Sequence, residues 1–237
     1  MQKWHYQRAA DFGLSLAESQ QQIPREPKML TWLLRDAGHL ALRTYLKLFH
    51  RLEITGREHL QAGGSRILVC NHTSHLDTLC LMAAVPFADL HRTFPAAASD
   101  YFFCSTVRSV FSAVLINALP FERKHGGAAS LDQCADLLST KGNTLILFPE
   151  GTRTKDGTLG RFRSGVVRLA RQANVPVVPC HLAGGLQAWP KGRPLPRPAK
   201  LRLHIGAPLS HRQFDRQSVA ASCADLRRHV ASLEQSS

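Results

Sequence analysis

The chain has 237 residues, of which 44% are hydrophobic and 20% are charged. This composition allows one large α/β domain with a buried core and excludes a wholly disordered chain. The 30 Lys and Arg residues outnumber the 17 Asp and Glu residues, which gives a net charge of +13. Such an excess suits an anionic partner, namely nucleic acid, an anionic membrane surface or a phosphorylated substrate, and composition alone does not choose among these.

Cysteine usage and the N-terminal sequence bear on the cellular compartment. The six cysteines contain no C-x-x-C pair, and in a chain of this size we interpret them as reduced thiols of a cytosolic protein. The first 20 residues lack the apolar core of a secretory signal. No window offers the roughly 18 apolar residues that a spanning helix needs. We therefore expect a cytoplasmic protein that, if it meets a membrane, lies peripherally on the cytoplasmic face.

Residues 1–27 are polar and indicate a flexible lead-in, and the periodicity of residues 29–50 predicts one amphipathic helix. Its apolar side carries Leu30, Leu33, Leu34, Ala37, Leu40, Ala41, Tyr45, Leu48 and Phe49, and its basic side carries Arg35, His39, Arg43, Lys47 and Arg51. One interpretation is a helix that covers a core and solvates its basic face. The other is an interfacial helix with its apolar stripe in the acyl boundary of a membrane. We expect residues 1–50 to form a membrane-surface segment and residues 51–237 to form the enzymatic domain.

From residue 66 onward, predicted strands alternate with predicted helices. Strands are expected at 66–70, 114–121, 144–148, 176–180 and 201–205, and helices at 76–84, 101–113, 130–140, 164–173 and 218–233. This alternation predicts an α/β fold, a mostly parallel sheet flanked by helices. In such sheets, ligands bind at the carboxyl ends of the strands.

The first segment with chemical potential is Asn71-His72-Thr73-Ser74-His75-Leu76-Asp77, directly after the strand at 66–70. A neutral imidazole is a suitable base near pH 7, and a carboxylate on its far nitrogen fixes the tautomer. On a continuous helix, His72 and Asp77 would point about 140° apart. The pair therefore requires His72 in the loop and Asp77 in the first helical turn.

The second segment is Phe148-Pro149-Glu150-Gly151-Thr152-Arg153, directly after the strand at 144–148. A strand followed by Pro and Gly predicts a tight turn with exposed backbone. Such a turn would present Glu150, Thr152 and Arg153 to a ligand, and the planar guanidinium of Arg153 suits a phosphate.

Together these segments resemble the glycerolipid acyltransferases, best known from lysophosphatidate (1-acylglycerol-3-phosphate) acyltransferase. That family has a catalytic His, four intervening residues and an Asp, and later a Phe-Pro-Glu-Gly-Thr-Arg block. Weaker similarity extends to Phe121-Glu122-Arg123, Phe162-Arg163-Ser164-Gly165 and Val175-Pro176-Val177-Val178-Pro179, so that residues 50–210 are covered. The chain departs from the family at Asn117 and Pro120, where the family's block usually has Gly and Phe.

The resemblance implies a reaction and its participants. It implies the catalytic pair His72 and Asp77 and the substrate-binding residues Arg123, Glu150, Gly151, Thr152 and Arg153. A fatty-acyl group would move from acyl-CoA or acyl carrier protein, without cofactor or metal, to the hydroxyl of a lysophospholipid on an anionic membrane. The expected acceptor is 1-acylglycerol-3-phosphate, which would give phosphatidic acid, and another lysophospholipid or a lyso-aminolipid is the alternative.

Three other interpretations compete with this one. His75 lies close to His72 and Asp77, but no remote Cys or His cluster completes a zinc site. The net charge would also suit a nucleic-acid-binding protein, yet we find no groove-reading or stacking motif and expect no nucleic-acid partner. An inactive lipid-binding module is disfavoured by the intact pair of His72 and Asp77.

Overall fold

The computed structural model describes residues 29–60, 63–98, 119–121 and 127–234. The strands are β1 (Glu53–Thr55), β2 (Arg66–Cys70), β3 (Thr93–Ala98), β4 (Leu119–Phe121), β5 (Thr144–Leu147), β6 (Val177–Ala183) and β7 (Arg202–Ile205). The helices are α2 (Met29–Phe49), α3 (Asp77–Ala84), α6 (Gly127–Ser139), α7 (Gly165–Ala173), α8 (Gly185–Ala188), α9 (His211–Asp215) and α10 (Val219–Ser232). Two short 3₁₀ helices are η1 (Arg57–Leu60) and η2 (Phe87–Arg92).

Within the described residues, the strands form one sheet in the order β1-β7-β6-β2-β5-β3-β4. The strands from β6 to β4 pair in parallel, and β7 pairs antiparallel with β6. The predicted fold class, a mostly parallel sheet flanked by helices, is therefore confirmed. Because β2 and β5 are adjacent and parallel, their carboxyl ends meet at one edge, which brings the two sequence motifs together.

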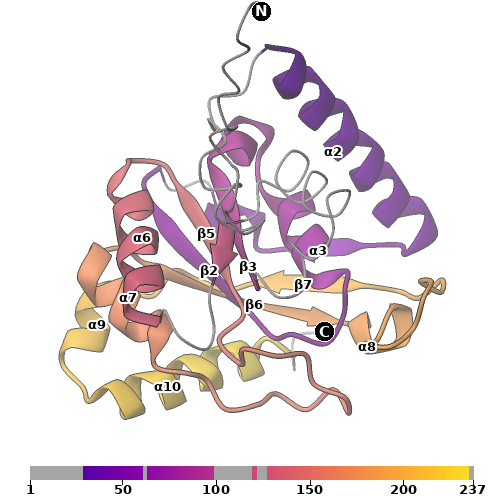
Figure 1. Cartoon of the computed structure of the whole chain (residues 1–237). Helices are drawn as coiled ribbons and strands as arrows, with labels where there is room; N and C mark the ends of the chain where they lie inside the picture. The colour runs from indigo at the N-terminus through magenta and orange to yellow at the C-terminus, as the bar shows by residue number, and fades with distance from the viewer. Residues whose placement is uncertain (1–28, 61–62, 99–118, 122–126, 235–237) are drawn as a thin grey trace, which may run out of the picture.

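Helices cover both faces of the sheet, and each face has its own apolar core (Figure 1). On one side, α2 and α3 pack over residues such as Leu68 and Ile146. On the other side, α6, α7, α9 and α10 pack over residues such as Val69 and Leu145. The strand β2 is buried along its whole length, which is why its sequence is continuously apolar from Ile67 to Cys70.

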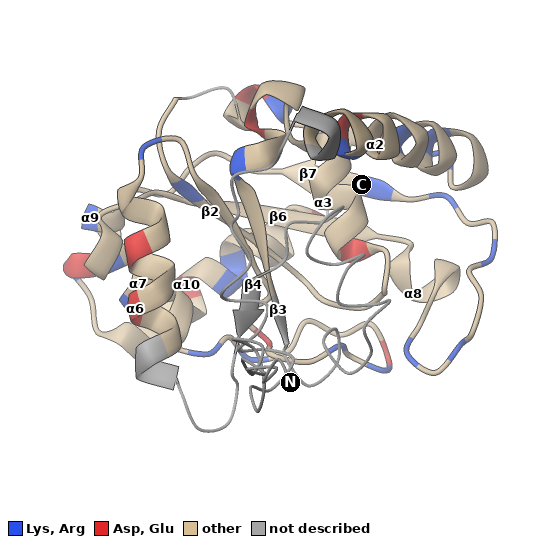
Figure 2. Cartoon of the chain, turned by 45° about the horizontal axis from the view of Figure 1, so that its top comes forward, with Lys and Arg blue, Asp and Glu red and all other residues tan. Residues whose placement is uncertain are grey.

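Helix α2 lies beside α3 (Figure 2). Its apolar and polar sides are separated as predicted, but it lies on the domain in the opposite sense to the first interpretation. Arg35 and His39 are buried against the domain, whereas Leu33, Leu40 and Leu48 are exposed. The interpretation that the helix solvates its basic face is therefore wrong for Arg35 and His39, whereas Lys47 and Arg51 are exposed.

The inward polar side chains of α2 have partners on neighbouring elements. Arg43 donates to the carbonyl of Val85 at the C-terminus of α3, where carbonyls lack partners within the helix. Asp36 contacts His91 of η2 at 3.0 Å. These polar contacts hold α2 to η2 and α3, and they explain why part of the basic side of the helix faces inward. Leu46 also packs in the core with α3, and the division of the chain at residue 50 stays a prediction.

Some expectations fall on residues that the structure does not describe. They are the helix at 101–113, most of the strand at 114–121, Asn117 and Arg123. Of the predicted strand, Leu119–Phe121 is observed as β4. The five described cysteines are free and buried.

Candidate active site

The segment after β2 places an imidazole against a buried carboxylate. His72 lies in the loop, and Asp77 is the first residue of α3, which is the arrangement that the spacing required. His72 Nδ1 lies 2.8 Å from Asp77 Oδ2, and the Asp77 side chain is fully buried. Because an ionised carboxylate only accepts hydrogen bonds, Nδ1 carries the hydrogen and Nε2 carries the lone pair.

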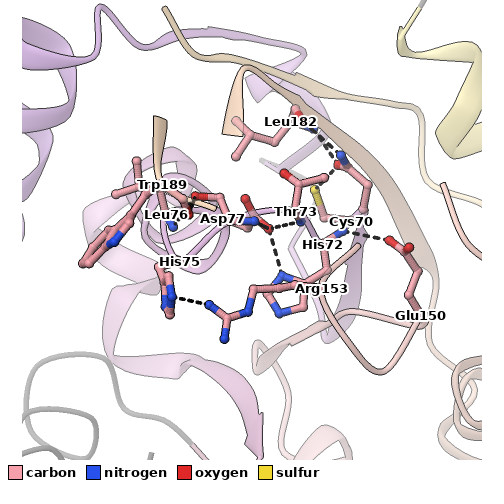
Figure 3. Close-up of polar contacts among 12 residues, drawn as sticks. Cys70, His72, Thr73, His75, Leu76, Asp77, Glu150, Arg153, Leu182 and Trp189 are labelled. Carbon is pink, nitrogen blue, oxygen red and sulfur yellow. Dashed lines mark hydrogen bonds and ion pairs between the residues drawn. The ribbon is translucent and has the colours of Figure 1, made fainter. Parts of the chain in front are cut away.

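Backbone groups hold the Asp77 carboxylate in place (Figure 3). The N–H groups of Thr73 and Ser74 donate to Asp77 Oδ2 at 2.7 and 2.8 Å. The same oxygen therefore receives hydrogen bonds from the imidazole and from two residues of the loop. Asp77 is thereby held in contact with the His72 ring.

The loop that carries His72 is fixed from two neighbouring strands. Asn71 exchanges two hydrogen bonds with the backbone of Leu182 in β6, at 3.1 and 2.8 Å. The ring of His72 stacks on Phe148, with centroids 4.1 Å apart. In addition, the N–H of Thr154 donates to the His72 carbonyl at 2.9 Å. The imidazole is thus positioned by residues that follow or belong to the two neighbouring strands, and 16% of its side chain stays exposed.

Glu150 joins the turn after β5 to the His72 loop. Its Oε1 accepts the N–H of His72 at 2.8 Å, and its Oε2 accepts the N–H of Gly160 at 2.9 Å. Burial raises the pKa of Glu150, and the two backbone donors act in the other direction. In the structure Glu150 therefore fixes the loop behind the imidazole, and its predicted contact with an acceptor stays a prediction.

The glycine and threonine of this turn differ in their surroundings. Gly151 adopts φ +75°, a left-handed conformation that favours glycine, and its N–H closes the turn by donating to the Phe148 carbonyl at 3.0 Å. A Cβ at this position would lie 2.6 Å from Nε of Arg163. Thr152 is exposed. Gly151 serves here as a turn residue, and the assignment of both residues to a phosphate site stays a prediction.

Arg153 lies beside the pair of His72 and Asp77 and contacts a second histidine, His75 (Figure 3). Burial, together with the charges of Arg153 and His72, lowers the pKa of His75 to about 4. His75 is consequently neutral at pH 7, and its Nε2 accepts a hydrogen bond from Arg153 Nη1. The ring of His75 also packs against Trp189, with centroids 4.9 Å apart. His75 thus orients Arg153, and among the described residues no group of three or more His, Cys, Asp or Glu side chains is arranged to hold a metal ion.

The segment after β6 forms a wall of the site that the sequence motifs did not indicate. Ser74 donates from its hydroxyl to the carbonyl of Trp189 at 2.9 Å. Gly185 packs so closely that an added Cβ would lie 2.6 Å from Thr73 Oγ1 and 3.0 Å from Asp77 Oδ1. The Gly184-Gly185 pair at the end of an apolar strand was the signal available in the sequence, because glycine at a strand end marks a close backbone approach.

An α/β fold with polar side chains gathered at the carboxyl edge of its sheet is typical of an enzyme. Comparison with known proteins identifies the family. The family model Acyltransferase matches residues 51–183, more than half of the chain, and the chain belongs to this family.

Relatives and solved structures support the same assignment. The chain is 30% identical over 161 residues to 1-acyl-sn-glycerol-3-phosphate acyltransferase of Limnanthes alba. The aligned region covers 67% of this chain and 54% of that protein. It is 26% identical over 198 residues to the protein of the same name of Bacillus subtilis, which covers 82% of this chain and 94% of that one. The chain therefore spans about half the length of its plant relative.

The fold has a counterpart among crystal structures. The 1-acyl-sn-glycerophosphate (LPA) acyltransferase PlsC from Thermotoga maritima superposes with a TM-score of 0.67 at 22% identity. The superposition covers 93% of this chain and 86% of that one. At this identity the likeness shows the fold.

Proposed function

We propose that the chain is a glycerolipid O-acyltransferase. It transfers a fatty-acyl group from a thioester donor to the free hydroxyl of a lysophospholipid, with 1-acylglycerol-3-phosphate as the acceptor and phosphatidic acid as the product. The observation that carries the proposal is the His72–Asp77 contact of 2.8 Å beside Arg153, at the carboxyl edge of a parallel sheet. The names of the relatives from Limnanthes alba and Bacillus subtilis support the same acceptor.

The proposed chemistry uses the lone pair on Nε2 of His72. As the acceptor oxygen attacks the thioester carbonyl carbon, Nε2 takes the hydroxyl proton and the ring becomes an imidazolium. Asp77 stabilises this charge through Nδ1. When the tetrahedral intermediate collapses, the C–S bond breaks and the thiolate leaves with the proton held by His72. The donor is acyl-CoA or acyl carrier protein. Because a thioester is already activated, this chemistry requires no cofactor.

The acceptor phosphate is assigned to arginine side chains. Arg153 offers a planar fork next to the imidazole, and His75 holds that fork in orientation. Arg123 joins this phosphate site by family resemblance and lies outside the described residues. Positioning both substrates at one imidazole supplies much of the rate, because it replaces an encounter in solution by a reaction between bound groups.

The exposed side of α2 supports attachment to a membrane surface. Leu33, Leu40 and Leu48 are 59%, 60% and 74% exposed, and Lys47 is exposed beside them. An outward apolar stripe of this kind suits the boundary between headgroups and acyl chains. No helix in the described part of the chain is long and apolar enough to cross a membrane. We infer that the protein binds anionic lipids peripherally on the cytoplasmic face, where its acceptor lipid resides.

One experiment tests the proposed reaction directly. Purified protein is incubated with labelled acyl-CoA or acyl carrier protein and a panel of lysolipids, and the products are identified by mass spectrometry. The proposal expects label in phosphatidic acid. Label only in another phospholipid or in an aminolipid would correct the acceptor. Absence of acyl transfer to every lysolipid, or salt-sensitive binding to DNA without binding to anionic vesicles, would contradict the proposed function.

A further inference from the structure

The segment between α8 and β7 is a basic, proline-rich loop that the proposed reaction does not use. Residues 190–200, the 190–200 loop, contain four prolines and four cations and no Asp or Glu. Leu195 near the middle of the loop is 72% exposed, and Lys191 and Arg197 on either side of it are also exposed. The loop therefore presents one large apolar side chain between cations.

The 190–200 loop has a fixed shape, because prolines and hydrogen bonds both restrict it. Each proline fixes its own φ. Trp189 Nε1 donates to the carbonyl of Arg193 at 2.8 Å, and the N–H of Arg197 donates to the carbonyl of Ala188 at 2.8 Å. These contacts hold the part of the chain that contains Leu195. A preorganised loop loses little conformational entropy when it binds a partner.

The charges of the loop are available to an anionic partner. At its C-terminal end, Lys200 pairs with Glu53 at 2.6 Å. Among the residues that the structure describes, no carboxylate oxygen lies within ion-pair distance of Lys191 or Arg197. Exposed cations of this kind are attracted to the surface of an anionic membrane when they come within a Debye length of it.

The 190–200 loop adjoins the end of α2. The N–H of Leu201, just after the loop, donates to the carbonyl of His50 at 3.1 Å, and His50 directly follows α2. Figures 1 and 2 both show the loop, between α8 and β7, at the same side of the domain as the C-terminal end of α2. Leu48 in the last turn of that helix is 74% exposed. A single exposed leucine is ordinary on a protein surface, but Leu195 belongs to a loop that adjoins a whole apolar stripe.

The N-terminal end of the loop reaches the candidate active site. Trp189 immediately precedes the loop, and its ring packs against that of His75, with centroids 4.9 Å apart. The Trp189 carbonyl accepts hydrogen bonds from Ser74 Oγ at 2.9 Å and from the N–H of His75 at 3.3 Å. His75 in turn contacts Arg153. A surface that binds the loop therefore lies close to the side chains assigned to the acceptor.

We propose that the 190–200 loop is a second membrane-docking element, with Leu195 at the boundary between headgroups and acyl chains and Lys191 and Arg197 on the phosphates of anionic lipids. The inference rests on the proposed function and adds to it the surface that presents the acceptor. Two docking elements in one chain reinforce each other, because binding of one raises the effective concentration of the other at the membrane. They also orient the domain, which turns the wall at Trp189 toward the lipids.

The test measures binding of the full chain to vesicles by flotation, without an acyl donor and therefore without turnover. The vesicles contain phosphatidylcholine alone or phosphatidylcholine with phosphatidylglycerol. Lys191→Gln with Arg197→Gln removes two cations from the loop. This variant should bind the anionic vesicles about thirtyfold more weakly at low salt. High salt should reduce the difference, because it screens surface charges.

A matched control removes the same two charges elsewhere. Lys141→Gln with Arg168→Gln changes one exposed lysine after α6 and one exposed arginine on α7, two helices that cover the other face of the sheet. Its binding should match the wild type. Leu195→Ser tests the apolar contact separately and should weaken binding roughly tenfold at low and at high salt, because hydrophobic burial is not screened. All the changed side chains are exposed, so the variants are expected to fold, and thermal unfolding checks this.

Kinetics with two forms of the acceptor separate docking from a role in the acceptor pocket. With the acceptor in anionic vesicles, each loop variant should raise the acceptor KM. With a short-chain acceptor dissolved in water, kcat and KM should match the wild type. An equal kinetic loss with the dissolved acceptor overturns the inference and assigns the loop to the pocket.

The vesicle assay decides the inference even if the proposed function fails. Absence of wild-type binding to anionic vesicles, or unchanged binding by either loop variant, overturns it. Unchanged vesicle binding together with lost binding to holo-acyl carrier protein would assign the loop to an acidic protein. A failure to acylate any lysolipid would contradict the proposed function alone, since vesicle binding is measured without turnover.

Discussion

Replacing Asp77 by Asn tests how the carboxylate supports His72. Asp77 Oδ2 accepts from Thr73 N, Ser74 N and His72 Nδ1. The two backbone donors favour an asparagine whose carbonyl oxygen, and not its NH₂ group, occupies this position. The variant then keeps the tautomer of His72 and loses only the negative charge. A change of the His72 tautomer is therefore the less favourable outcome.

The magnitude follows from the same geometry. Charge centres roughly 4 Å apart interact by about 4 kcal/mol at an effective dielectric constant of 20. Since each 1.4 kcal/mol is a factor of ten, Asp77→Asn is expected to lower kcat about a thousandfold with little change in either KM. Steady-state kinetics at saturating substrates measure this, and thermal unfolding confirms the fold. Asp136→Asn, on the exposed side of α6, is the control. An Asp77→Asn enzyme within tenfold of the wild-type kcat would refute the assigned role.

Three further predictions concern the acceptor, the wall of the site and the membrane. Arg153→Ala removes a charged phosphate contact, so the acceptor KM should rise roughly ten- to a hundredfold; a defect confined to the donor KM would contradict this. Gly185→Ala places a Cβ 2.6 Å from Thr73 Oγ1. Overpacking of this kind should lower the unfolding free energy by about 1–3 kcal/mol and should lower kcat. An unchanged melting temperature and an unchanged kcat would show that the segment around Gly185 moves to accommodate the methyl group. Leu40→Glu and Leu48→Glu together should release the protein from anionic liposomes in a flotation assay, and retained flotation would assign attachment elsewhere.

The sequence predicted the parts of this fold that rest on local patterns. The buried strands β2 and β5 have continuous apolar runs, and their parallel pairing alone brings His72 and Glu150 to one edge. Two strands, β1 and β3, were not predicted. Glu53–Thr55 has only three residues, and Thr93–Ala98 contains a proline and three alanines, which are weak strand formers.

Other features depend on contacts between distant residues, which periodicity does not encode. The periodicity of α2 separated two sides, yet it did not tell which side meets the domain, because Arg43 finds its acceptor on Val85 only in the folded chain. Likewise, Glu150 looked like a ligand-binding residue, and its partners are backbone N–H groups of His72 and Gly160. Backbone donors carry no sequence signal, so this role required coordinates.

The central claim is that His72 acts as the base in acyl transfer. The most direct measurement compares wild type with His72→Gln in a labelled transfer assay to 1-acylglycerol-3-phosphate, with acceptor binding measured separately. Gln keeps a polar side chain and removes the basic nitrogen. The account predicts a loss of about a thousandfold in kcat with acceptor affinity retained. A variant whose kcat stays within tenfold of the wild type would contradict the claim.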